Sequence, residues 1–170
     1  MPFYGLFMKA ELENVEKITC PEDIVWTLDV RHSAGTDVRE KITINAQEEF
    51  EIPNSKGTAN FMVKFEGAKQ FATMSILVPT RKNEVKSLKG AELGVFTPET
   101  AATVPLAIFD CRGLEPVKCH PVANFTVVST GEAVFEAADF SDPDGWSEYD
   151  EKADLSLTVS GIEFEFRIVK

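Results

Sequence analysis

Apolar and polar residues alternate one by one through most of this sequence, and this pattern limits the folds that the chain can adopt. Successive side chains of a β-strand point to opposite faces of the sheet, so the alternation predicts strands that bury one face. The apolar members of the clearest runs are Leu6, Met8, Ala10 and Leu12; Ile24, Trp26, Leu28 and Val30; Ala59, Phe61, Val63 and Phe65; Ala72, Met74, Ile76 and Val78; Val104, Leu106 and Ile108; Phe125 and Val127; and Ile162, Phe164, Phe166 and Ile168. Clusters of Gly, Pro, Asn and Ser separate the runs, and no stretch shows a convincing helical period. We therefore predict an all-β fold, with antiparallel sandwich- or barrel-like sheets and little helix.

The length of 170 residues fits a single domain, 1–170, or two packed β halves of about 1–80 and about 100–170. The section between Val78 and Val104 is the candidate junction, because it contains Pro and Gly and has little periodicity. Near the end, the runs 155–159 and 162–169 flank Ser160-Gly161. This arrangement predicts a β-hairpin across Ser160-Gly161.

The formal net charge of −11 excludes several partners. Nucleic acids and anionic membranes bind through Lys and Arg, and no basic patch offsets the negative charge here. No apolar run approaches the ~20 residues of a membrane-spanning helix. The three cysteines, Cys20, Cys111 and Cys119, form no Cys-x-x-Cys pair, so we expect reduced thiols and a location in the cytosol or the nucleus.

Catalytic and metal-binding patterns are absent from the sequence. Only two histidines occur, and Cys119 and His120, as neighbours on a strand, would point to opposite faces and so form no dyad. No nucleophile elbow or phosphate-binding glycine loop is present. Acidic residues crowd 139–154 with partial calcium-loop spacing, but Phe140 would occupy the first ligand position and has no side-chain oxygen. We therefore expect a solvated acidic loop there, and no catalytic residue, cofactor or metal.

Two strings in the second half of the chain are more distinctive. They are residues 109–116, FDCRGLEP, and residues 146–153, WSEYDEKA. With the N-terminal segment 8–14, MKAELEN, and the strand ending in Trp26-Thr27-Leu28, they resemble the eukaryotic CXXC-motif-containing zinc-binding protein family, a family of unknown function. The similarity extends, with gaps, over nearly the whole chain.

The resemblance implies a small all-β protein with two Cys-x-x-Cys knuckles that together hold one structural zinc. In this chain the first pair falls on His32 and Gly35 and the second pair on Phe65 and Ala68. One imidazole cannot replace four thiolates, so the zinc is not expected here. Phe65 is expected to fill the space between the knuckles. It also continues the apolar face of its own strand run.

The resulting hypothesis is a non-enzymatic scaffold or interaction module that binds another, unknown protein. The predicted interaction surface consists of Arg112, Glu115, Trp146, Tyr149 and Asp150, because aromatic residues and Arg are common binding anchors. A structural alternative pairs Arg112 with Asp150 or Glu151 beneath Trp146, with Trp146 and Tyr149 in a loop. A different functional class, a hydrolase or small-ligand-binding protein, would need a deep cleft with two buried carboxylates of shifted pKa.

Overall fold

The computed structural model describes residues 3–77, 93–100, 104–121 and 123–169. These described residues form strands and no helix, and all strand pairs are antiparallel. The prediction of an all-β antiparallel fold is thus confirmed. In the described part of the chain there is accordingly no helix long and apolar enough to cross a membrane.

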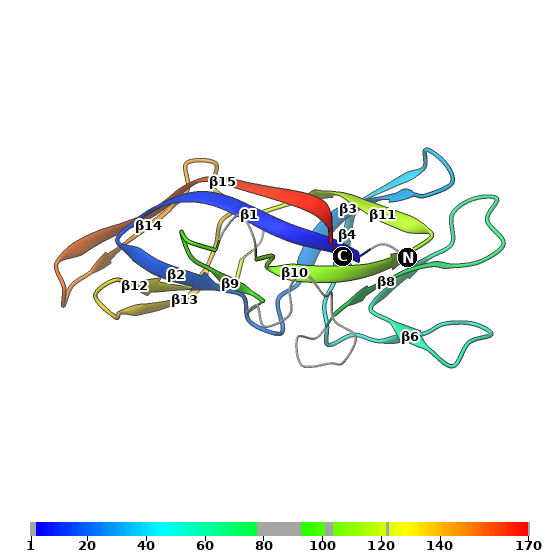
Figure 1. The fold of residues 1–170 in the computed structure, drawn as a ribbon, viewed down its shortest axis with the longest axis horizontal. Coiled ribbons are helices and arrows are strands. Elements are labelled where there is room, and N and C mark those ends of the chain that lie inside the picture. The colour runs from blue at the N-terminus through cyan, green and yellow to red at the C-terminus, as the bar shows by residue number, and fades with distance from the viewer. Residues whose placement is uncertain (1–2, 78–92, 101–103, 122, 170) are drawn as a thin grey trace.

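The largest sheet has six strands and is organised around the first and last strands of the chain. Its order is β14 (Trp146–Asp150), β15 (Leu155–Val169), β1 (Phe3–Glu13), β10 (Ala107–Arg112), β8 (Ala72–Ile76) and β7 (Phe61–Val63). Strands β1 and β15 lie side by side along the long axis of the molecule (Figure 1). Val78, the last apolar residue predicted for the β8 run, lies outside the described residues.

Three smaller sheets complete the fold. They are β11 (Leu114–Cys119), β3 (Trp26–His32) and β4 (Val38–Ile44); β13 (Val134–Ala138), β12 (Phe125–Ser129), β2 (Val15–Thr19) and β9 (Val95–Phe96); and β5 (Phe50–Glu51) with β6 (Thr58–Ala59). Each sheet of three or more strands combines strands from before residue 80 with strands from after residue 90. Sheet pairing therefore gives no boundary between the sections 1–80 and 100–170.

The predicted apolar faces form much of the core. In β3, Trp26, Leu28 and Val30 are buried, whereas Thr27 and Asp29 between them are only half-buried. The Trp26 ring meets the Phe125 ring of β12 edge-on, which joins the three-stranded sheet to the four-stranded one. Burial of each such large side chain contributes about 1.5–3 kcal/mol to stability.

The hairpin predicted at Ser160-Gly161 is wrong, because β15 continues through this dipeptide as one strand. Lys9 pairs with Glu163 and Glu11 pairs with Ser160, so two residues of β15 oppose the single residue Ala10. This is a β-bulge, and Gly161 adopts the positive φ of 61° that such bulges favour. The dipeptide changes the phase of the alternation without reversing the chain.

Gly145, which precedes β14, has no room for a side chain. Its φ is 97°, and an added Cβ would overlap the carbonyl oxygen of Val159. We expect Gly145→Ala to lower the free energy of unfolding by about 2–5 kcal/mol, measured by urea denaturation. Gly67→Ala is the matched control, since Gly67 has φ 81° but open space around it, and should cost about 1–2 kcal/mol. Equal losses in the two variants would contradict the steric explanation.

Candidate functional site

Two turns from distant parts of the chain face one another. The first follows β3, where the Gly35 amide donates to the His32 carbonyl oxygen at 3.2 Å. The second follows β7, where the Ala68 amide donates to the Phe65 carbonyl oxygen at 3.0 Å. The His32 and Phe65 rings stack, with centroids 4.6 Å apart and planes inclined by 15°. The four residues singled out by the resemblance therefore open and close two similar turns that are joined by a ring contact.

The chemistry of this turn pair does not fit a four-thiolate zinc site. Phe65 is 2% exposed, and the Arg39 guanidinium lies 5.8 Å from its ring centroid. Gly35 and Ala68 have no side-chain donor atoms, which leaves the His32 imidazole alone. Across the described ranges, no three His, Cys, Asp or Glu side chains are grouped as metal ligands. The two turns are instead connected by an aromatic joint, the stacked rings of His32 and Phe65. Stacking of this kind contributes about 0.5–1.5 kcal/mol to stability beyond the effect of burial.

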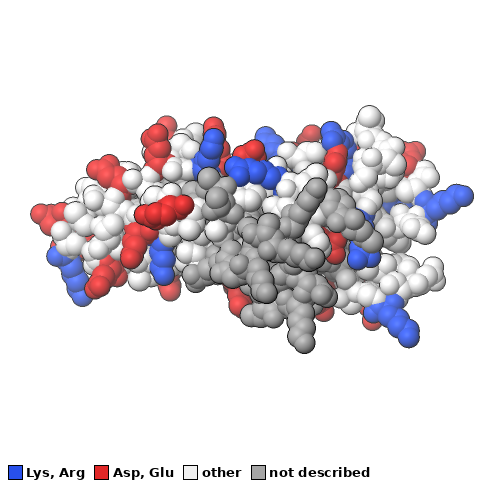
Figure 2. All heavy atoms as spheres, in the orientation of Figure 1, with Lys and Arg blue, Asp and Glu red and all other residues white. Residues whose placement is uncertain are grey.

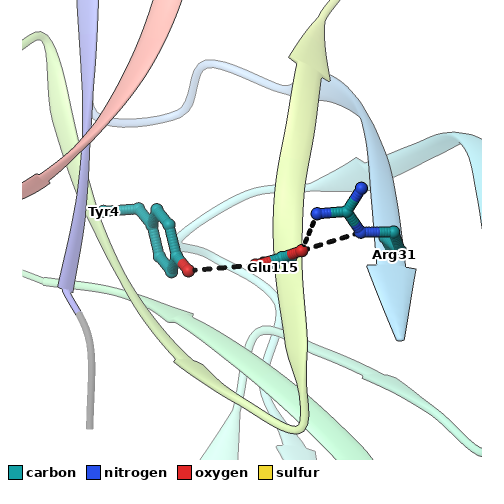
Figure 3. Close-up of polar contacts among 3 residues, drawn as sticks. All are labelled: Tyr4, Arg31 and Glu115. Atoms are coloured by element: carbon teal, nitrogen blue, oxygen red, sulfur yellow. Dashed lines mark hydrogen bonds and ion pairs between the residues drawn. The ribbon is translucent and has the colours of Figure 1, made fainter. Parts of the chain in front are cut away.

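Glu115 of β11 is held between two sheets (Figure 3). Its Oε1 accepts hydrogen bonds from the Arg31 guanidinium, with Nε at 2.7 Å, and its Oε2 accepts one from the Tyr4 hydroxyl at 3.4 Å. Burial, and then the negative charge of Glu115, raise the pKa of Tyr4, which keeps the phenol a neutral donor. Glu115 thus links β1 of the six-stranded sheet to β3 of the three-stranded sheet.

Arg112 lies far from the acidic residues that the structural alternative assigned to it. Its guanidinium is 3.7 Å from Asp110 of the same strand, and its side chain is 59% exposed. Asp110 pairs with Phe3 at one end of β1, whereas β14 lies beside the part of β15 that pairs with the other end of β1. The separation along β1 is about 30 Å at ~3.3 Å per residue, and the β10–β11 junction and β14 lie at opposite ends of Figure 1. The predicted pairing of Arg112 with Asp150 or Glu151 is therefore wrong.

Trp146, Tyr149 and Asp150 belong to edge strand β14, so their prediction as loop residues is also wrong. Trp146 packs edge-on against Phe135 and Phe140, with centroids 5.8 and 6.5 Å away. Asp150 is 2% exposed and accepts hydrogen bonds from Ser129 Oγ at 2.7 Å and from the Ala153 amide at 3.2 Å. Tyr149 is 47% exposed. The five predicted surface residues therefore form two separate groups rather than one surface.

The acidic loop before β14 is anchored in the core. Phe140 is buried and stacks on Phe125, with centroids 4.7 Å apart. Asp139 and Asp142 accept hydrogen bonds from the amides of Ser141 and Asp144, each two residues further along. The hydrogen bonds from Ser141 lower the pKa of Asp139. These carboxylates cap their own turns, and the residue at the first position of the calcium-like spacing points into the core.

His120 contacts a residue that the sequence did not suggest. Its Nε2 lies 2.7 Å from Asp29 Oδ1, which also accepts a hydrogen bond from the Lys41 amide. Burial opposes ionisation of Asp29, but these hydrogen bonds lower its pKa overall. Cys119 is buried, and burial raises the pKa of its thiol to about 12, so it remains protonated at neutral pH. The Cys119 thiol donates to the His120 carbonyl oxygen at 3.5 Å, whereas the imidazole is bonded to Asp29.

The fold and the turns define an all-β protein of antiparallel sheets in which two knuckle-like turns meet. The chain belongs to the family described as "CXXC motif containing zinc binding protein, eukaryotic", whose model matches residues 5–167. The resemblance inferred from the sequence is thereby confirmed.

Individual relatives match over nearly their whole lengths. A UPF0587 protein of Nematostella vectensis is 26% identical over 164 residues, which cover 95% of this chain and 96% of that protein. A CXXC motif containing zinc binding protein of Bos taurus is 28% identical over 165 residues, which cover 95% of each. A solved structure of a hypothetical protein from Plasmodium falciparum superposes with a TM-score of 0.83 at 28% identity, covering 98% of this chain and 100% of that one.

Among the residues of the predicted interaction surface, some side chains pack within the fold and others are exposed to solvent. We expect Trp146→Ala to lower the free energy of unfolding by about 2–4 kcal/mol, because it removes a ring packed against two others. Arg112→Ala should change stability by less than about 0.5 kcal/mol, because the side chain is exposed. Thermal and urea denaturation of both variants checks this difference. A large loss for Arg112→Ala would show that its contact with Asp110 matters more than its geometry indicates.

Proposed function

We propose that this chain is a zinc-independent member of its family that acts as a non-enzymatic protein-interaction module. The observation that carries the first half is the stack of His32 on Phe65 between two similarly built turns. The family resemblance assigns the cysteine pairs to His32 and Gly35 and to Phe65 and Ala68. On this proposal, ring packing replaces a metal as the link between the two turns.

For the proposed interaction with a partner protein, we place the binding surface at the end of the molecule that contains Tyr149. Glu115, Trp146 and Asp150 are occupied by contacts within the fold, as described above. Tyr149 is a large aromatic side chain exposed on an edge strand, and aromatic side chains are frequent anchors in protein interfaces. Reduced, unpaired thiols support the expectation of a cytosolic or nuclear location.

A hydrolase that uses a pair of buried carboxylates is not supported. Within the described ranges, Asp150 is the one charged residue that is fully buried, and its oxygens bind Ser129 and Ala153. Among the described residues, the carboxyl groups of Asp29 and Asp139 have pKa values that are lowered rather than raised. A general acid at neutral pH needs a raised value, so neither group is suited to that role.

Zinc content tests the metal half directly. Protein purified without a polyhistidine tag should contain far less than one zinc per chain by inductively coupled plasma mass spectrometry. Its melting temperature should also be unchanged by a chelator, because no thiolate set is present at the turns. A full equivalent of zinc that survives mild chelation would overturn this half.

Restoring the ligands should restore the site if the two turns are arranged as the proposal states. We expect the variant His32→Cys/Gly35→Cys/Phe65→Cys/Ala68→Cys to bind one zinc per chain and to give the visible absorption of tetrahedral cobalt–thiolate when loaded with Co²⁺. Gly35 can accept a Cβ, since the nearest atom to it is His32 Nδ1 at 3.3 Å, which the same variant removes. The double variant Gly35→Cys/Ala68→Cys, which keeps both rings, is the control and should not form the site. A folded quadruple variant without cobalt–thiolate bands would contradict the arrangement.

Affinity capture tests the interaction half. Tagged wild-type chain should retain a defined partner from cell extract in the presence of EDTA, and Tyr149→Ala should lose it without a change in melting temperature. Phe50→Ala is the matched control, because Phe50 is 44% exposed and lies in β5, whose sheet is separate from the one that contains Tyr149. Equal retention by wild type and Tyr149→Ala, or equal loss in both variants, would count against an interface at Tyr149.

A further inference from the structure

Negative charge is concentrated at one end of the molecule. Residues 130–154 contain nine Asp or Glu and one basic residue, Lys152, so they carry −8 of the formal charge of −11. These residues build β13, β14 and their flanking turns. Figure 2 shows acidic side chains gathered over the left end of the visible face, where Figure 1 places β12, β13 and β14. A strong local negative potential attracts cationic partners and repels anionic ones.

The same end contains a groove of about 460 Å³ between two turns. The β12–β13 turn contributes Gly131, Glu132 and Ala133, and the end of β14 with the turn after it contributes Tyr149, Asp150, Glu151 and Lys152. Phe135 of β13 completes the lining. The groove therefore combines aromatic surface with three carboxyl groups and one ammonium group, Lys152, and this net negative lining suits a side chain that has an apolar stem and a cationic head.

Hydrogen bonds hold the two turns of the groove together. Asp150 accepts a hydrogen bond from Ser129 Oγ, and Ser129 Oγ accepts one from the Gly131 amide at 2.9 Å. Gly131 lies so close to the second turn that an added Cβ would overlap that of Ala153. A groove fixed in this way is preorganised, which reduces the entropy lost when a ligand binds.

The charges at the groove favour a peptide over a metal ion. Glu132 and Glu151 are exposed, and neither forms an ion pair with another described residue. The acidic groups in the described residues are also too dispersed to make a three-ligand metal cluster. Separated carboxylates around an aromatic groove match separated cationic side chains along an extended chain.

We propose that the groove between the turns 130–133 and 151–154 binds an extended, Lys- and Arg-rich segment of a partner protein. Glu132 and Glu151 pair with its cationic groups, and Tyr149 and Phe135 pack against the aliphatic stems of its side chains. This inference rests on the proposed interaction function and specifies the chemistry of the partner.

Fluorescence anisotropy with a labelled alternating Arg–Ala octapeptide tests the proposal at physiological ionic strength. Wild type should bind this probe and not an alternating Glu–Ala octapeptide. The charge-neutralising variant Glu132→Gln/Glu151→Gln should raise the Kd by about threefold to tenfold. The control Glu40→Gln/Glu49→Gln removes the same charge from exposed positions outside the groove and should change the Kd by less than about twofold.

Tyr149→Ala should raise the Kd about two- to fivefold, whereas Tyr149→Phe, which keeps the ring, should leave it nearly unchanged. If the wild type did not bind the Arg–Ala probe, or if the two charge variants raised the Kd equally, the assignment of a basic segment to this groove would be overturned. If capture of a partner still depended on Tyr149 in that case, the interaction function would stand and only the chemistry of the ligand would be wrong. If the probe did not bind and capture of a partner did not depend on Tyr149, the proposed interaction function at this surface would be wrong as well.

Discussion

The pairing of β1 with β15 is the contact on which the rest of the fold depends. This antiparallel ladder joins residues 3–13 to residues 158–169, and β10 and β14 then add to its outer edges. The ladder closes a loop of about 150 residues. Closing such a loop lowers the entropy of the chain and is slow, so many contacts formed together must offset the entropy loss. At the bulge around Gly161 the alternation of β15 shifts by one residue, so that Leu157 and Val159 before it are buried and Phe164 and Phe166 after it are half-buried.

The sequence predicted strands in which apolar and polar residues alternate and missed several that lack this alternation. Strands β3 and β12 bury every second residue, and in the second half of β1 half-buried residues alternate with exposed ones. Strand β14 was predicted as a loop, because it is a charged edge strand with Trp146 and Asp150 as its inward residues. At Ser160-Gly161 the alternation shifts by one residue, and a bulge and a hairpin produce the same local sequence signal.

The candidate site was only partly predictable for a related reason. Turn spacing and family resemblance indicated the pairs at His32 and Phe65, but the contacts that define each role join residues far apart in the chain. Arg31 with Glu115, Asp29 with His120, and Ser129 with Asp150 are such pairs, separated by 84, 91 and 21 positions. No local pattern marks these partners, since each depends on which strands the sheets place side by side. A charged residue in the sequence therefore could not be assigned to binding or to stability before the fold was known.

The aromatic joint between the β3 and β7 turns also determines how the molecule responds to its chemical surroundings. A thiolate cluster is opened by peroxide, because sulfur is oxidised, and by scarcity of the metal that it holds. Stacked imidazole and phenyl rings have neither weakness, and the buried thiols elsewhere in the fold are protonated and shielded. A joint of this kind contains neither oxidisable sulfur nor a metal ligand set, so neither oxidation of a thiolate nor loss of a metal ion would open it.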